Sequence, residues 1–110
     1  MHYTKNKLLI DRINVDRIIR KFGSPTYCYS YNKLRENILK FKKNFIKINP
    51  LICFAVKSNN NKMILNEIAR LGLGADVVSK GELMAALKSK INPKKIVFSG
   101  VGKTYDEINF

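Results

Sequence analysis

The chain has 110 residues, with 21 Lys or Arg against 8 Asp or Glu and a formal net charge of +13. Its length suits one small domain with one core, and its 45% hydrophobic content excludes wholesale disorder. No apolar run approaches the roughly 18 residues that span a bilayer, and the first residues carry no apolar signal sequence. We therefore expect a cytoplasmic protein with no membrane partner.

The positive charge raises the question of nucleic-acid binding. Lysines are spread from Lys5 to Lys103, and the one dense group is residues 40–43. The aromatic residues, such as Phe54 and Phe98, lie inside apolar runs and do not alternate with basic residues. A dispersed charge of this kind is typical of solvated faces, so no nucleic-acid partner is expected.

Two cysteines, Cys28 and Cys53, lie 25 positions apart with no histidine near them. A structural zinc site needs about four ligands, which this chain cannot assemble. We expect no metal site and two reduced, partly buried thiols.

The first 25 residues are predicted to form a short N-terminal segment of strand and helix. Residues 8–10 and 13–15 have the composition of short strands. Residues 15–22 indicate a helix that ends at Gly23, since glycine suits the residue after a helix. Residues 26–30 are rich in aromatic and β-branched side chains and are predicted to be extended.

Residues 32–48 predict an amphipathic helix, which the Asn49-Pro50 pair ends. Apolar side chains recur every three or four positions and form one stripe. The stripe consists of Leu34, Ile38, Phe41, Phe45 and Ile48.

From residue 51 onward the pattern alternates between strands and helices. Residues 51–56, 75–78 and 96–98 are nearly continuous apolar runs, which are typical of parallel strands covered on both faces. Helices are predicted between them, at 62–71 and 80–89. The first has its apolar stripe at Ile64, Leu65, Ile68 and Leu71, and the second at Leu83, Met84 and Leu87. This order predicts successive βα units of a parallel α/β fold. Both a barrel and an open sheet are compatible with such units.

The second of these helices also has a start signal. Ser79 and Glu82 have the spacing of a capping box, in which each side chain accepts a hydrogen bond from the other residue's backbone.

Each predicted strand runs into polar residues at its carboxyl end. In a parallel sheet these ends meet at one edge, and in a barrel that edge carries the chemistry. The polar groups are Lys57-Ser58-Asn59, Ser79-Lys80 and Ser99-Gly100.

Lys57 and Asp76 are the candidate site residues. A lysine at the mouth of a buried strand loses hydration, which frees its amine to attack an aldehyde and hold it as a Schiff base. The plainer alternative is that Lys57 ends the strand and faces solvent. Asp76 interrupts an apolar run and needs a partner, for which Lys57 is a candidate. A structural ion pair or a hydrogen-bonded turn acid is the alternative for Asp76.

Residues 99–104 resemble a nucleotide-binding P-loop in their Gly-Lys-Thr ending. That motif requires a glycine where this chain has Val97. A glycine-rich turn between a strand and a helix is the better interpretation.

Together, five segments of this chain resemble the family of diaminopimelate decarboxylases, within the alanine-racemase-like class of pyridoxal phosphate enzymes. The most specific are Ala55-Val56-Lys57-Ser58-Asn59 and Gly74-Ala75-Asp76-Val77-Val78-Ser79. The Phe98–Thr104 segment favours this branch over ornithine or arginine decarboxylases. The other matching stretches are 24–30 and 34–37, and the resemblance runs from about residue 22 to the end.

This resemblance implies the N-terminal part of a (β/α)8 TIM-type barrel, with residues 26–110 as its first βα units after the 1–25 segment. It implies pyridoxal 5'-phosphate as cofactor, with Lys57 as the lysine that holds it and Asp76 close by. The implied reaction converts meso-2,6-diaminopimelate into L-lysine and CO2, in lysine biosynthesis, with a homodimer as the full-length form. A closed barrel needs eight βα units and typically about 250 residues, so we expect this chain to be inactive alone.

Three alternatives stay open at this point. They are a decarboxylase of ornithine or arginine type, a non-catalytic pyridoxal-phosphate-binding barrel protein, and a basic α/β remnant that binds partners without chemistry.

Overall fold

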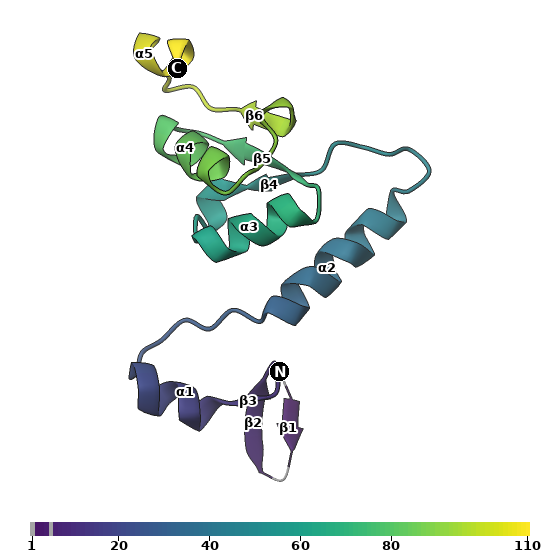
Figure 1. The fold of residues 1–110 in the computed structure, drawn as a ribbon, viewed down its shortest axis with the longest axis vertical. Helices are drawn as coiled ribbons and strands as arrows, with labels where there is room; N and C mark the ends of the chain where they lie inside the picture. The colour runs from purple at the N-terminus through teal and green to yellow at the C-terminus, as the bar shows by residue number, and fades with distance from the viewer. Residues whose placement is uncertain (1, 5) are drawn as a thin grey trace. The chain divides into compact units, whose positions relative to one another are not determined.

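The computed structural model describes residues 2–4 and 6–110, which divide into two compact units, Met1–Asn44 and Phe45–Phe110 (Figure 1). Each unit is a continuous stretch of chain with its own sheet. The first holds an antiparallel sheet and the second a parallel one. Within the described residues, no helix has the length and apolar character to cross a membrane.

The first unit opens with three short strands followed by a helix. Strands β1 (His2–Thr4), β2 (Lys7–Ile10) and β3 (Ile13–Asn14) pair antiparallel in that order, and α1 (Val15–Phe22) follows. The Asn14 side chain accepts from the Asp16 N–H at the start of α1, and Gly23 ends the helix with φ of +79°. The helix predicted over residues 15–22 is confirmed at both ends.

The extended segment predicted at residues 26–30 forms no strand in the structure, so that prediction is wrong. Tyr27 is 91% exposed, and Cys28 is exposed where a partly buried thiol was expected. Aromatic and β-branched residues favour strands because they pack on a neighbouring strand. None of the described strands pairs with this segment. Its side chains therefore have no neighbouring strand to pack on, and the segment does not form a strand.

Helix α2 (Tyr31–Asn44) begins one residue before its predicted start and ends four residues before its predicted end. Residues 45–48 form turns, in which the Ile48 and Asn49 N–H groups both donate to the carbonyl of Phe45. The predicted apolar stripe is not buried as a whole. Leu34 and Ile38 are half-buried, whereas Phe41 is 51% and Ile48 is 71% exposed.

The second unit contains the three predicted parallel strands, and they pair in chain order. They are β4 (Cys53–Ala55), β5 (Gly74–Val77) and β6 (Ile96–Phe98), and Ala55 pairs with Asp76, which pairs with Val97. Helices α3 (Lys62–Arg70) and α4 (Lys80–Lys88) connect them, and α5 (Tyr105–Asn109) follows β6. Two single turns of 3-10 helix lie at Val56–Ser58 and Pro93–Lys95. The predicted succession of βα units is confirmed.

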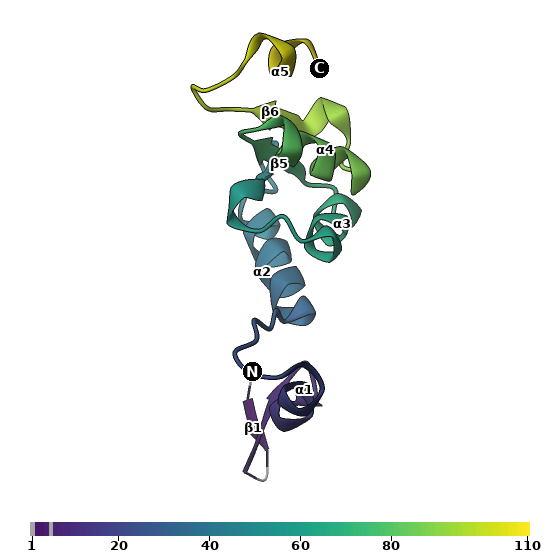
Figure 2. The same ribbon diagram turned by 90° about the vertical axis from the view of Figure 1, so that its left-hand side faces the viewer.

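Helices α3 and α4 lie on the same side of this sheet (Figure 2). Ala75 and Val77 of β5 are fully buried on the covered face, together with Leu65, Ile68 and Ala86 of the helices. In α4 the predicted stripe is wrong, because Met84 and Leu87 are 37% and 38% exposed while Ala86 is buried. Small residues on this face bring the helix close to the strand, and the larger ones lie beside the contact.

Gly74 is required where β5 begins. A Cβ built there would lie 2.1 Å from the Lys95 carbonyl oxygen and 2.9 Å from Cys53 Sγ. No side chain fits in that space, so the backbones around β4, β5 and the turn before β6 approach one another only because residue 74 is glycine.

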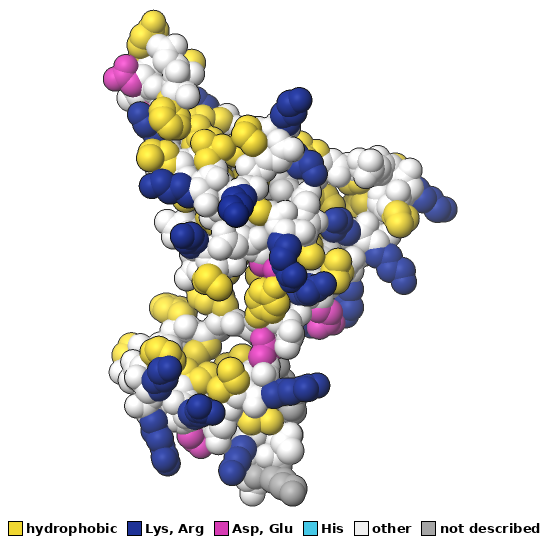
Figure 3. Space-filling view, viewed as in Figure 1, with side chains coloured by type: hydrophobic (Ala, Val, Ile, Leu, Met, Phe, Trp, Pro, Cys, Tyr) yellow, Lys and Arg dark blue, Asp and Glu magenta, His cyan; other side chains and the backbone are white. Residues whose placement is uncertain are grey.

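Lysine and arginine side chains are dispersed over the face seen in Figure 3, among smaller apolar areas. They do not gather into one basic patch on that face. On this face, the arrangement agrees with the interpretation that the lysine and arginine side chains are dispersed and face solvent.

Candidate functional site

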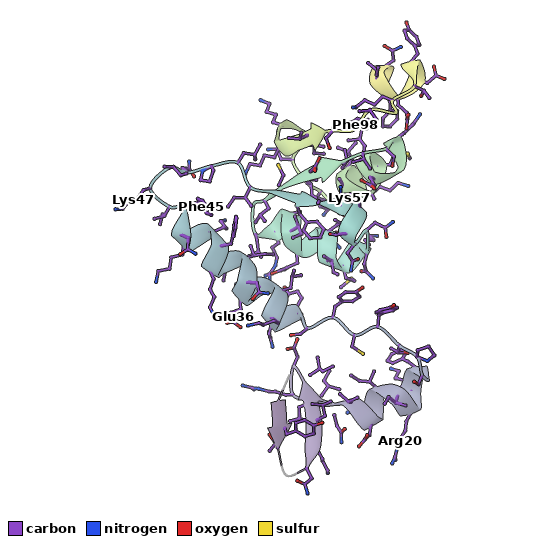
Figure 4. The ribbon with its side chains drawn as sticks, turned by 180° about the vertical axis from the view of Figure 1, so that it is seen from behind. Arg20, Glu36, Phe45, Lys47, Lys57 and Phe98 are labelled. Carbon is purple, nitrogen blue, oxygen red and sulfur yellow. The ribbon has the colours of Figure 1, made fainter. Side chains whose placement is uncertain are left out.

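The candidate site lies in the second unit, where the three parallel strands end. Parallel strands bring their carboxyl ends to one edge of a sheet, and the residues after β4, β5 and β6 therefore share that edge. Figure 4 labels Lys57 just after β4 and Phe98 at the end of β6.

Lys57 is the middle residue of the 3-10 turn that follows β4. Ser58 Oγ donates to the Ala55 carbonyl at 2.7 Å, and the Asn59 N–H donates to the Val56 carbonyl at 3.0 Å. These two bonds fix the backbone while the fully buried Val56 anchors the turn. The Lys57 side chain is exposed, so the expected loss of hydration does not occur in this structure.

Asp76 lies in the middle of the sheet, between Ala55 and Val97. Its carboxylate is half-buried, and its Oδ1 accepts a 2.5 Å hydrogen bond from Ser99 Oγ. Lys57 was one candidate partner for this carboxylate, and a hydrogen-bonded acid was the alternative. In this structure the carboxylate is hydrogen-bonded, and its partner is the Ser99 hydroxyl from the end of the neighbouring strand. A hydroxyl satisfies a half-buried carboxylate without burying a second charge.

Ser99 is the residue of this site whose role the sequence did not reveal. Its place after an apolar strand was visible, but its pairing with Asp76 depends on the register between β5 and β6. Asp76 pairs with Val97, and Ser99 lies two positions beyond Val97 on the same face of the sheet. The signal to search for is a polar residue two positions beyond the residue that pairs with the carboxylate on the neighbouring strand.

Cys53 lies on β4, the strand next to the one that carries Asp76. Its Sγ is 3.7 Å from the Lys95 carbonyl oxygen. Burial raises the pKa of the Cys53 thiol, and the negative charge of Asp76 raises that pKa further. The thiol is therefore kept protonated and unreactive at neutral pH, as expected for a structural cysteine.

The turn after β6 is closed by its own residues. Lys103 Nζ donates to the Gly100 carbonyl at 2.5 Å and lies 5.0 Å from the centre of the Phe98 ring. Thr104 caps α5 in a capping box with Glu107. The lysine and threonine that resemble a P-loop have these local roles, and the predicted glycine-rich turn between strand and helix is confirmed.

The start of α4 adds further polar groups to the same edge. Ser79 Oγ accepts from the Glu82 N–H at 3.3 Å, as predicted. The reciprocal half of the predicted capping box is wrong, because the Glu82 carboxylate accepts from the N–H of Val78 and not of Ser79.

Helix α5 is joined to this edge by two contacts. Glu107 Oε1 accepts from the Lys80 N–H at 3.1 Å, and Lys80 Nζ lies 4.3 Å from the centre of the Phe110 ring. Hydrogen bonds from Thr104 and Lys80 lower the pKa of Glu107, so its carboxylate is charged when it makes them.

The residues present fit an aldehyde cofactor. Among the described residues, no ion pair or hydrogen bond engages the Lys57 ammonium, which leaves a primary amine accessible at the sheet edge. An aldehyde needs such an amine, and a carboxylate held on the adjacent strand gives the site a fixed negative charge. A lysine at the carboxyl end of a parallel strand in a βα repeat is an arrangement that an α/β protein can use to hold an aldehyde cofactor.

The family follows from comparison with known proteins. Residues 31–110 match the model of the pyridoxal-dependent decarboxylase family, pyridoxal binding domain. This chain belongs to that family, whose cofactor is pyridoxal phosphate. The fold class and the cofactor predicted from the sequence are thereby confirmed.

Several curated and solved relatives are diaminopimelate decarboxylases. The Pseudomonas aeruginosa enzyme is 42% identical over 106 residues, which are 96% of this chain and 26% of that protein. The M. jannaschii enzyme in co-complex with L-lysine is 34% identical, with a TM-score of 0.93 over 97% of this chain and 26% of that one. The Helicobacter pylori enzyme complexed with L-lysine is 43% identical, with a TM-score of 0.82 over 86% of this chain and 24% of that one. This chain thus spans about a quarter of the length of these relatives.

Proposed function

We propose that this chain is the cofactor-holding N-terminal segment of a diaminopimelate decarboxylase. The full enzyme would remove a carboxylate from meso-2,6-diaminopimelate and release L-lysine and CO2. The observation that carries the proposal is the accessible Lys57 amine at the carboxyl end of β4. The solved relatives that contain L-lysine support this substrate class.

Lys57 and Asp76 have separate roles in this proposal. Lys57 is the residue that would hold pyridoxal phosphate through its Nζ. Asp76, one strand away, would keep a fixed negative charge beside that amine. Pyridoxal phosphate, when bound, supplies an electron sink for the electrons left by the departing carboxylate.

The remaining parts of the proposal concern the complete enzyme. It would work as a homodimer in the cytoplasm. Residues 1–110 provide three parallel strands of a barrel that needs eight. We therefore expect residues 1–110 alone to release no CO2 from diaminopimelate.

Covalent trapping tests the assignment of Lys57. The protein is incubated with pyridoxal 5'-phosphate, reduced with borohydride and digested, and the modified lysine is identified by mass spectrometry. We expect the label on Lys57. Lys57→Arg should abolish that label, because a guanidinium stays protonated and does not react with an aldehyde.

Lys62→Arg is the matched control, since Lys62 is also exposed and lies at the start of α3. This variant should be labelled at Lys57 like the unchanged protein. Label concentrated on Lys62, Lys80 or Lys103 would overturn the assignment.

A further inference from the structure

We propose that Ser99 is a positioning residue that fixes the Asp76 carboxylate on the strand next to the one that leads into Lys57. The inference rests on the proposed function, since it concerns the site where Lys57 would hold the cofactor. Ser99 contacts Asp76 through one short hydrogen bond, which the register of β5 and β6 makes possible.

The hydrogen bond joins two strands that neighbour each other in the sheet. Ser99 Oγ donates to Asp76 Oδ1 at 2.5 Å, and the two residues are 23 positions apart in the chain. The Ser99 N–H donates to the Val77 carbonyl at 2.9 Å and so continues the β5–β6 ladder beyond Phe98. The backbone of Ser99 is thus fixed to the strand that carries Asp76.

Both side chains belong to one face of the sheet. Asp76 pairs with Val97, and Ser99 follows Val97 by two positions, so strand alternation places all three on the same face. Ala75 and Val77 belong to the opposite face, where they are buried under the helices. Val97 is 47% exposed, so the face with Asp76 is the open one in this unit.

The turn after Ser99 is braced. Gly100 has φ of +95°, a conformation that other residues rarely adopt, and its carbonyl accepts from Lys103 Nζ. Lys103 also lies over the Phe98 ring at 5.0 Å. These contacts keep the chain on either side of the serine in one conformation, and its hydroxyl is therefore held toward Asp76.

The Ser99 hydroxyl donates to one oxygen of the Asp76 carboxylate, and the second oxygen stays available as an acceptor. Across the described part of the chain, Asp76 Oδ1 has the Ser99 hydroxyl as its partner, and no hydrogen bond reaches Oδ2. A carboxylate with one oxygen fixed keeps one orientation, and its second oxygen can accept from a donor on the cofactor or from Lys57. Without the hydroxyl, the carboxylate rotates and this acceptor is lost for part of the time.

The experiment is a mutant cycle on capture of pyridoxal 5'-phosphate at Lys57. Capture is measured as the concentration of pyridoxal 5'-phosphate that gives half-maximal borohydride-trapped label on Lys57. The variants are Ser99→Ala, Ser99→Thr, Asp76→Asn and the double variant Ser99→Ala/Asp76→Asn.

We expect Ser99→Ala to weaken capture about tenfold, since a hydrogen bond to a charged group contributes about that factor. Ser99→Thr keeps the hydroxyl and should restore capture. In the Asp76→Asn background, Ser99→Ala should add no further loss, because the serine acts through the carboxylate. If Ser99 only stabilised the fold, Ser99→Ala would weaken capture by the same factor in the unchanged protein and in Asp76→Asn.

Three results would overturn the inference. Equal label on Lys57 in the unchanged protein and in Ser99→Ala overturns it while leaving the proposed function intact, and so does an additive loss in the double variant. Absence of label on Lys57 in the unchanged protein overturns the proposed function and this inference with it.

Discussion

The two units of this chain differ in how their residues are buried. In Phe45–Phe110, eight apolar residues are buried, and six of them are fully buried, including Leu65, Ile68 and Val77. In Met1–Asn44, no described residue is buried. This unit instead has an open cleft of about 880 Å³, lined by residues such as Ile10 and Phe22.

The difference comes from how each unit arranges its apolar residues. The βα repeat of the second unit sets helices against a sheet within one short stretch of chain, and it builds a core there. The first unit has a small antiparallel sheet, one short helix and α2, and their apolar side chains stay at least partly exposed. The candidate site lies in the unit that has the core, where a buried framework can hold side chains in place.

The largest expected effect is the loss of a core side chain in the second unit. Leu65 is fully buried, and Leu65→Ala should cost about 3 kcal/mol by removing packed atoms and leaving a cavity. Hydrogen exchange should show lost protection of the amides of α3 and β5. Leu39→Ala is the matched control in the first unit, where Leu39 is 46% exposed and the change should cost less than about 0.5 kcal/mol. Similar losses of protection in the two variants would contradict the difference drawn between the units.

Gly74→Ala should have the next largest effect. Its new Cβ would overlap the Lys95 carbonyl, and such overpacking costs about 2 kcal/mol. The expected result is faster exchange at the amides that join β4, β5 and β6. Gly102→Ala is the control, because a Cβ at Gly102 meets nothing within 4 Å. If both alanine variants exchange like the unchanged protein, the close approach at Gly74 does not constrain the sheet.

Two helix caps allow the same substitution to be compared in both units. Asn61 caps α3 and Asn14 caps α1, each by accepting a backbone N–H two residues on. Replacement by alanine should cost about 1 kcal/mol at either position. Asn61→Ala should lower protection across the core, because α3 carries Leu65 and Ile68, whereas Asn14→Ala should loosen α1 alone.

Aspartate at either cap position is the control, since it keeps the acceptor and should preserve protection. If Asn14→Ala also lowered the exchange protection of amides in the second unit, the prediction that this substitution loosens α1 alone would be wrong.

The smallest expected effect depends on pH and concerns the start of α2. Asp11 accepts from Ser30 Oγ at 2.6 Å and from the Asn32 N–H at 3.1 Å, and these bonds lower its pKa. A carboxyl whose pKa is lowered on folding adds stability above its ordinary pKa of about 3.9, and that stability is lost as the pH falls through the lower folded value. Acidification through this range should therefore release the start of α2.

Asp11→Asn should remove that pH dependence, which NMR shifts of the Ser30 and Asn32 amides would report. Glu107 has a lowered pKa for a similar reason in the second unit, so acid should also free the Lys80 N–H there. A pH response at Asn32 that persists in Asp11→Asn would assign it to another group.

Some of this protein could be predicted from its residues alone. The helix at 15–22 has a capping residue before it and a glycine after it, and both signals are local. The three strands and the helices between them are predicted by uninterrupted apolar runs that alternate with helical periodicity. The expected coverage of both faces is not found in this unit, because α3 and α4 lie on one face and Val97 on the other is 47% exposed. The βα order, Lys57 at a strand end and the glycine-rich turn at 99–104 all depend on near neighbours in the chain.

Only the tertiary structure decided the rest. Composition favoured a strand at residues 26–30, but a strand needs a partner, and the described strands offer none. Periodicity selected Leu83, Met84 and Leu87 in α4, yet the helix buries Ala86, because the distance to β5 determines which face can approach. The partner of Asp76 is Ser99 and not Lys57, since the register between β5 and β6 sets which polar groups meet. Local patterns thus determined the elements, whereas contacts between residues far apart in the chain determined which side chains form the site.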